Sequence, residues 1–189
     1  MTDQEMITRC KKGDREAFNE LMIKYQKQVF NMAYSILSDY EDASDASQEV
    51  FVKVYRSIAS FRGKSAFTTW LYTICRNVCN DALRKRQRKG FTISIDSNED
   101  ENNPVAELPS EELSPEEHYE MSERQRIVRD AIRSLSPEYR EIIMYSDMEQ
   151  LSYDEIARIL KCPNGTVKSR LNRARNALKK KLSEKKELF

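Results

Sequence analysis

Apolar side chains recur at three- and four-residue steps along most of this chain, which is the spacing of amphipathic helices. The longest such run follows Asp14, an N-cap residue type, and extends to about Ile36. A possible capping box, Thr2 with Glu5, precedes it. The pattern predicts a first short helix and then a long amphipathic one. The apolar positions of the long helix are Phe18, Leu21, Met22, Tyr25, Val29, Met32, Ala33 and Ile36.

The same periodicity predicts further helices, while strand signals are essentially absent. We therefore expect an all-α fold. The further helices are expected over residues 41–57, 65–88 and 122–135, then after a Ser136 cap with Pro137 at the first helical position, and after a capping box of Ser152 and Glu155.

Charge divides the chain into three parts, although the formal net charge is only +1. Residues 62–90 carry eight Lys or Arg against one Asp, and residues 161–189 carry ten against two Glu. Residues 91–123 carry eleven Asp or Glu and no Lys or Arg, and they lack the apolar groups needed to offset ordering entropy. We therefore expect two small helical domains, residues 1–90 and 122–189, joined by a flexible acidic linker over residues 91–121.

The strongest local motif is a helix-turn-helix within residues 151–181. A short helix after Ser152 is followed by the turn sequence CPNG and a second helix with apolar groups from Val167 to Leu178 at helical spacing. The opposite face carries side chains that suit the major groove and the phosphates of duplex DNA. These are Lys168, Ser169, Asn172, Arg173 and Arg175.

The basic part of the first domain suggests single-stranded DNA instead. The helix expected over residues 65–88 has one apolar face, an opposite polar face and Trp70 at the border, and a loop with Phe61, Arg62 and Lys64 precedes it. Aromatic and cationic groups together suit unstacked bases and their backbone. The alternative, in which Trp70 and Phe67 are core and the basic end of the helix is solvated, stays open. The polar face consists of Thr69, Thr73, Arg76, Asn77, Asn80 and Arg84.

The remaining chemistry is sparse. Cys75 and Cys79 lie one helical turn apart, but a tetrahedral metal site needs more ligands than the chain offers, and His118 lies in the acidic linker. We expect reduced, packed thiols, no metal, no cofactor and no enzymatic activity. The polar start of the chain and the lack of a long apolar run predict a cytoplasmic protein without membrane insertion.

The two halves together resemble the bacterial sigma-70 family of transcription initiation factors, in its extracytoplasmic-function (ECF) branch, which has only regions 2 and 4. The resemblance to region 2 rests on the segments DASDASQEVFVKVY and FTTWLYTICRNVCNDALRK. The resemblance to region 4 rests on the segments LSPEYREIIMYSDMEQLSYDEIARIL and CPNGTVKSRLNRARNAL. The chain departs from the family pattern at Ser44, Ser47, Asn164 and at Lys161, where Gly is common.

The resemblance implies a sigma factor with three sets of site residues. Those for core RNA polymerase are Asp42, Asp45, Gln48 and Glu49, on a helix whose Ala43, Val50, Phe51 and Val54 would point inward. Those for the single-stranded minus-10 element are Phe61, Arg62, Lys64, Trp70, Arg76, Asn77, Asn80 and Arg84. Those for the minus-35 duplex are Thr166, Lys168, Ser169, Arg170, Asn172, Arg173 and Arg175.

The expected partners are therefore core RNA polymerase, promoter DNA and an anti-sigma factor. Two other classes of protein compete with this interpretation. A helix-turn-helix repressor or activator would explain the second domain but not the basic, aromatic helix of the first. A structural or adaptor protein would leave both cationic helices unexplained.

Overall fold

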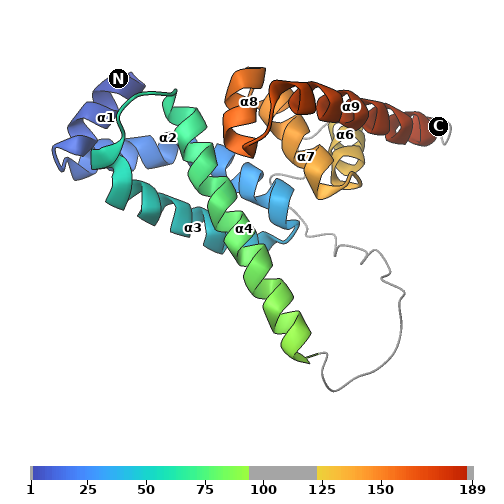
Figure 1. The fold of residues 1–189 in the computed structure, drawn as a ribbon, viewed down its shortest axis with the longest axis horizontal. Helices are drawn as coiled ribbons and strands as arrows, with labels where there is room; N and C mark the ends of the chain where they lie inside the picture. The colour runs from blue at the N-terminus through green and yellow to red at the C-terminus, as the bar shows by residue number, and fades with distance from the viewer. Residues whose placement is uncertain (1, 94–122, 187–189) are drawn as a thin grey trace.

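The computed structural model describes residues 2–93 and 123–186, and every regular element in these ranges is helical (Figure 1). This confirms the predicted all-α class. The first module contains α1 (Asp3–Lys11), α2 (Arg15–Leu37), α3 (Tyr40–Ser57), the 3-10 turn η1 (Ile58–Ser60) and α4 (Phe67–Ile93). The second contains α6 (Glu123–Arg133), α7 (Pro137–Ile143), the π-helical turn η3 (Met144–Met148), α8 (Tyr153–Leu160) and α9 (Asn164–Lys186).

The predicted starts of the first two helices are confirmed. Thr2 and Glu5 form both hydrogen bonds of a capping box on α1, and the Asp14 carboxylate accepts from two backbone amides at the start of α2. These bonds satisfy amides that have no partner within the helix. The backbone hydrogen bonds to the Asp14 carboxylate also hold its pKa below the usual range of an aspartate.

The core of the first module lies where the periodicity of α2 predicts it. Leu21, Val29 and Met32 are almost fully buried, together with Val50 of α3 and Leu71 of α4. Removing a side chain of this size from water contributes about 1.5–3 kcal/mol. Apolar burial along α2 therefore fixes the positions of α3 and α4, on which the first module's candidate sites lie.

The second module is organised around the helix-turn-helix. Ser152 and Glu155 form the predicted capping box on α8. Ser136 is the N-cap of α7, as predicted, but its side chain makes no capping hydrogen bond. Ile156 of α8 and Val167 of α9 are fully buried between the helices, as their spacing indicates.

Two boundaries differ from the sequence expectations. Helix α4 continues to Ile93, beyond its predicted end near Arg88, so the first residues assigned to the linker are helical. The CPNG turn is also shorter than expected, because Asn164 and Gly165 already belong to α9. Lys161 makes the turn with φ of 54°, in the left-handed region that favours glycine. The rest of the predicted linker, with His118, lies outside the described residues.

The two modules pack against each other. Helix α7 lies against α2, and α8 lies against α4, while the C-terminal end of α4 projects beyond the other helices (Figure 1). Buried apolar side chains of both modules form one continuous cluster. Within the described ranges, no helix is long and apolar enough to cross a membrane.

Candidate nucleic-acid and protein interfaces

Helix α9 presents an exposed polar face, as predicted for a helix that reads duplex DNA. Its apolar side, which includes Leu171 and Ala174, is buried against the module. On the opposite side, Arg173 is held against its own helix, because its Nε donates a hydrogen bond to the Ser169 carbonyl oxygen at 3.3 Å. The exposed members of the predicted set are Lys168, Ser169, Asn172, Arg173 and Arg175.

Two predicted arginines of α9 are engaged by carboxylates of their own module. Arg175 binds Asp147 through two guanidinium nitrogens, one of them at 3.2 Å. Arg170 is half-buried and lies 3.9 Å from Glu138. Thr166 is also half-buried. The structure therefore distinguishes Arg173, whose guanidinium lies over its own helix, from arginines that link α9 to neighbouring elements.

The aromatic residues before and on α4 form one cluster. The Phe61 ring is 5.0 Å from that of Trp70 and 5.8 Å from that of Phe67, and the last two are 5.7 Å apart. Phe61 is only 8% exposed, and Trp70 is half-buried. Phe61 therefore belongs to the core, although it was predicted to contact DNA. Phe67 is core at 7% exposed, as the alternative had it, whereas Trp70 keeps part of its surface accessible.

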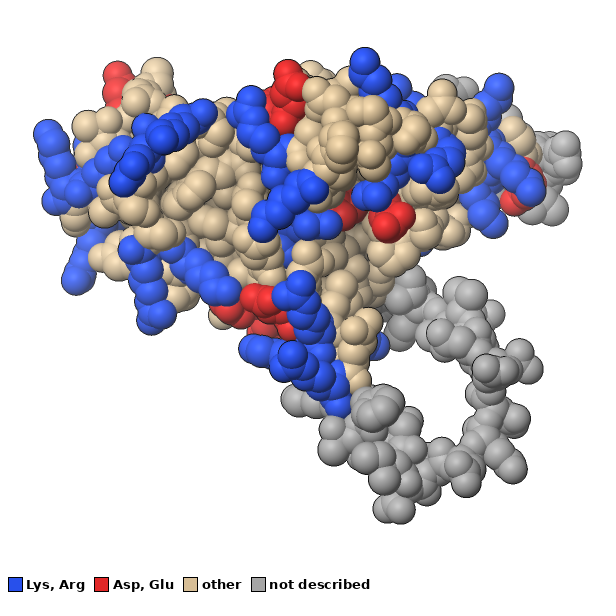
Figure 2. All heavy atoms as spheres, viewed as in Figure 1, with Lys and Arg blue, Asp and Glu red and all other residues tan. Residues whose placement is uncertain are grey.

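The cationic and amide groups around this cluster are largely at the surface. Arg62 and Lys64 are exposed in a loop that turns at Gly63, whose φ is 69°. Asn77 and Arg84 are exposed on α4, and Asn80 is half-buried. Figure 2 shows Lys and Arg side chains gathered over the projecting end of α4 and over the α8–α9 part of the molecule.

A stripe of polar residues on α4 faces the second module instead of solvent. We call it the α4 stripe: Thr69, Tyr72 and Arg76, which lie three and four positions apart. Each donates a hydrogen bond to a carboxylate of the second module. The pairs are Thr69–Glu155 at 3.0 Å, Tyr72–Glu149, and Arg76–Glu141 at 2.7 Å.

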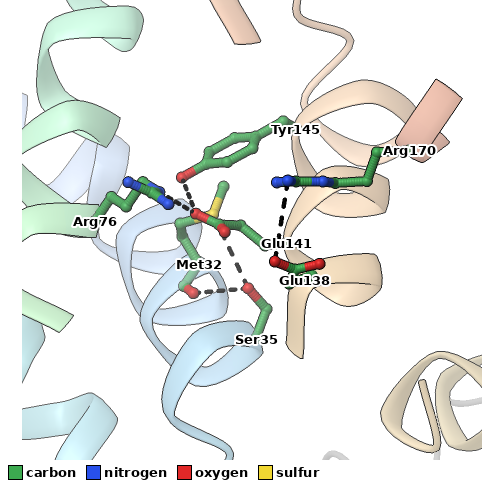
Figure 3. Close-up of polar contacts among 7 residues, drawn as sticks. All are labelled: Met32, Ser35, Arg76, Glu138, Glu141, Tyr145 and Arg170. Carbon is green, nitrogen blue, oxygen red and sulfur yellow. Dashed lines mark hydrogen bonds and ion pairs between the residues drawn. The ribbon is translucent and has the colours of Figure 1, made fainter. Parts of the chain in front are cut away.

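The Arg76–Glu141 pair is the most enclosed of the three. Figure 3 shows Arg76 reaching the Glu141 carboxylate beside Met32 and Ser35 of α2. Tyr145 donates to the same carboxylate at 3.2 Å. Burial raises the pKa of Glu141, and the attraction of Arg76 opposes this shift only in part. Burial also raises the pKa of Tyr72, and its hydrogen bond to Glu149 adds to the increase.

Sequence reasoning missed the carboxylate side of these pairs. It placed Thr69 and Arg76 on the polar face of α4 and gave Glu155 only a capping role. It gave no role to Tyr72, Glu141 or Glu149. One available signal was Glu141, a charged residue that directly precedes the apolar run IIMY. A carboxylate in such a position is costly to bury unless a partner compensates it.

Helix α3 presents the predicted acidic outer face. Ala43, Val50 and Val54 are buried, and Phe51 is half-buried against the core. Asp39 caps the helix by accepting from a backbone amide. The predicted polymerase-binding residues Asp42, Asp45, Gln48 and Glu49 are all exposed.

Exposed apolar groups extend the acidic face, which the sequence analysis did not anticipate. Val52 and Tyr55, in the later turns of α3, are 47% and 49% exposed. Val52 lies one helical turn from Gln48 and Glu49, so it shares their face. Uncovered apolar surface beside charges is typical of a surface that binds another protein.

The cysteines are placed as packed thiols. Cys10, Cys75 and Cys79 are buried, and Cys162 is half-buried. A hydrogen bond with Cys79 and burial both raise the pKa of Cys75 well above its usual value. Among the described residues, no three His, Cys, Asp or Glu side chains are grouped so as to hold a metal ion.

Comparison with known proteins finds both predicted regions. Residues 21–89 match the family Sigma-70 region 2, and residues 125–178 match the family Sigma-70, region 4. The chain is 40% identical over 182 residues to the ECF RNA polymerase sigma-E factor of Haemophilus influenzae, covering 96% of each chain. It is also 40% identical over 185 residues to the factor of the same name from Escherichia coli K12, covering 96% of this chain and 95% of the relative.

A solved structure agrees in fold. The sigma factor RpoE from Bartonella quintana, in complex with the anti-sigma factor NepR, is 28% identical with a TM-score of 0.66, covering 88% of this chain and 96% of that one. Both sigma-70 regions are thus present in order, and the curated relatives match nearly end to end. The protein therefore belongs to the sigma-70 family, in its extracytoplasmic-function branch.

Proposed function

We propose that this protein binds core RNA polymerase and directs transcription from specific promoters. Its first module would capture the minus-10 strand, and its second would read the minus-35 duplex. The observation that carries the proposal is the presence of two cationic helices, α4 and α9, in separate modules, together with an acidic face on α3 that borders the end of α4, where Arg86 lies 3.7 Å from Asp42. The protein itself catalyses no reaction, because the polymerase supplies the chemistry of RNA synthesis.

For minus-35 recognition, α9 enters the major groove. Arg173 and Asn172 are exposed and have the hydrogen-bonding groups that read base edges, and Lys168 neutralises phosphate. The buried side of α9 is held by α8 and α7, so this face keeps its shape. The remaining residues of this set are Thr166, Ser169, Arg170 and Arg175.

For minus-10 capture, α4 and its preceding loop provide a cationic track. Arg62, Lys64 and Arg84 suit the backbone of a single strand, and Asn77 and Asn80 suit its base edges. Trp70 offers the partly exposed ring for stacking. Phe61 would contribute by supporting Trp70, since its own ring is buried.

For polymerase binding, the acidic face of α3 is the candidate. Asp42, Asp45 and Glu49 repel DNA and attract a basic protein surface. Val52 adds apolar area that a protein partner can bury. The face is exposed while the two modules are packed together, so a partner can reach it without rearrangement.

Each of the three segments expected from the sequence has a role in this proposal. We assign polymerase and minus-10 binding to residues 1–90, a connecting role to residues 91–121, and minus-35 binding to residues 122–189. The protein works in the cytoplasm, where the polymerase is. By analogy with the Bartonella relative, whose solved complex contains an anti-sigma factor, we also propose control by such a protein.

A transcription assay tests the proposal. Purified protein is mixed with core RNA polymerase and a library of promoter fragments, and transcripts are sequenced. A sigma factor gives transcripts that start at shared positions downstream of common minus-10 and minus-35 sequences. A repressor or activator would bind duplex DNA and give none, and this result would overturn the proposal.

A further inference from the structure

One arginine of the second module is buried without a partner in the described part of the chain. Arg140, on α7, is 7% exposed, and its Nε has no hydrogen-bond partner there. The neighbours whose charges act on its pKa are Tyr34 and Arg133, and no carboxylate of the described residues is among them. A buried guanidinium is costly unless an anion or a set of acceptors compensates it. The packing of α7 on α2 therefore encloses a positive charge for which the described residues supply no counter-charge.

A second guanidinium lies close to the first. Arg133, in the last turn of α6, is half-buried, and its Cζ atom lies 5.4 Å from the centre of the Tyr34 ring on α2. Burial lowers the pKa of Arg140, and the positive charge of Arg133 also lowers it, while Tyr34 opposes this shift. Two like charges are thus held near each other by the packing of three helices. We call Tyr34, Arg133 and Arg140 the junction site, because α2, α6 and α7 meet there.

The carboxylates nearest to Arg140 along α7 are directed at other arginines. Glu138 lies 3.9 Å from Arg170 of α9, and Glu141 accepts a hydrogen bond from Arg76 of α4 at 2.7 Å (Figure 3). Each of these two acids therefore already has a cationic partner outside the junction site. The junction site itself combines two guanidinium groups and a phenol, which is the composition of a site for an added anion.

We propose that the junction site binds a small phosphate-bearing anion, either the free phosphate ion or the terminal phosphate of a nucleotide. The forked N–H groups of arginine donate pairs of parallel hydrogen bonds to the oxygens of such a group. A phosphate monoester carries a charge of about −1.5 to −2 at neutral pH, so one group neutralises both arginines. A single carboxylate would leave one of them uncompensated. The site is separate from the proposed DNA-binding and polymerase-binding faces.

The ligand reaches Arg140 from the side of its two partly exposed neighbours. Arg133 and Tyr34 are both half-buried, so part of each side chain contacts solvent, whereas Arg140 is covered. Arg133 can turn towards an anion by giving up its contact with the Tyr34 ring, and such contacts are weak at partly exposed positions. The bound phosphate would then link α6 to α7. Because the ligand binds the folded chain, it would also stabilise the fold.

The test follows the buried Nε–H group of Arg140 directly. Nuclear magnetic resonance records the arginine Nε–Hε signals of the full-length, ¹⁵N-labelled protein, and the signal missing in Arg140→Gln identifies Arg140. Inorganic phosphate is titrated in while sodium chloride keeps the ionic strength constant. Adenosine monophosphate and sodium acetate are titrated in separate arms. Arginines of α4 and α9 that meet phosphate at the surface give their own signals, so they do not obscure the result.

Inorganic phosphate should shift the Arg140 signal saturably, because this N–H gains its first acceptor. Arg133→Gln removes one cation from the site and should weaken the apparent affinity about tenfold or more, the usual effect of losing a charge-assisted hydrogen bond. The matched control is Arg126→Gln, which removes an exposed arginine from the same helix. It should titrate as the wild type does. Phosphate should also raise the thermal unfolding midpoint more for the wild type than for Arg133→Gln.

The separate arms identify the source of the phosphate and can refute the proposal. Saturation by adenosine monophosphate at lower concentration than by inorganic phosphate would identify a nucleotide, and the reverse order would identify the free ion. If Arg133→Gln folds poorly, Arg133→Lys keeps the charge but loses the fork, and it should also bind phosphate more weakly. An Arg140 signal that does not move with phosphate, or equal affinity after both substitutions of Arg133, would overturn the proposal. An equal response to acetate would overturn the choice of phosphate.

Discussion

Arginines on one helix can have different roles even when their sequence positions look equivalent. The sequence placed Arg170, Arg173 and Arg175 together on the face that reads DNA. In the structure, Arg170 and Arg175 contact carboxylates of neighbouring elements, whereas the Arg173 guanidinium contacts a carbonyl of its own helix. This difference makes Arg173 the strongest candidate for base recognition.

Arg173→Ala should therefore weaken binding to the preferred minus-35 duplex by about 1–3 kcal/mol and relax the preference at one base position. The measurement is a binding titration against duplexes that vary one position at a time. Lys168→Ala serves as the contrast and should weaken all duplexes alike while lowering the salt dependence. A uniform loss for Arg173→Ala would instead identify this arginine as a phosphate contact.

At the scale of elements, the sequence predicted the structure well where all the residues of a signal lie within a few positions of one another. The capping box at Ser152 and Glu155 and the spacing of Val167 and Leu171 were sufficient to place α8 and α9. The turn between them was predicted less well, because Lys161 occupies a left-handed conformation that its sequence does not suggest. Hydrogen bonds from Ser152, first from its backbone amide, hold the pKa of Glu155 below its usual range.

This capping box predicts a pH-dependent contribution to stability. Ionised Glu155 stabilises the fold at pH values above its unfolded pKa of about 4.3, and the contribution is lost as the pH falls through the lower folded pKa. At neutral pH, Glu155→Ala should lower the free energy of unfolding by about 0.3–1.5 kcal/mol. Urea denaturation of both proteins from pH 7 down to pH values below about 4 should show the difference narrowing.

The comparison needs a charge control. Glu184→Ala removes a carboxylate from an exposed position near the end of α9, where Glu184 pairs with Lys181 of the same helix. Its effect on unfolding should be small at every pH. If the difference between wild type and Glu155→Ala stays constant on acidification, ionised Glu155 is not what stabilises α8.

At the scale of the whole molecule, the sequence predicted two modules but not how they meet. Arg76 and Glu141 are 65 positions apart, and neither has a local pattern that points to the other. The same is true of Tyr72, which the sequence analysis left without a role. Pairing between modules depends on geometry built by the separate cores, so periodicity and capping signals cannot reveal it.

The proposed role of the acidic face of α3 belongs to this scale, because it concerns binding to a large partner, core RNA polymerase. Reversal of charge at Asp45 and Glu49 to lysine should abolish binding to core RNA polymerase, since the basic partner surface would then be repelled. Duplex binding through α9 should be retained. Co-elution with core polymerase on a sizing column measures the first effect, and a gel shift measures the second.

The charge-matched control is reversal of Glu20 and Glu184, which are exposed on α2 and α9. It should co-elute with the polymerase as the wild type does. Survival of the polymerase complex after reversal of Asp45 and Glu49 would contradict the role of α3.

The placement of the cysteines leaves one of the four accessible to a fluorescent label. Cys10, Cys75 and Cys79 are all buried and shielded from solvent, and burial raises the pKa of Cys10 and contributes to the raised pKa of Cys75. Cys162 is partly exposed in the turn just before α9. A maleimide dye should therefore label the native protein at this one position among the four, and its emission should change when duplex DNA docks beside it.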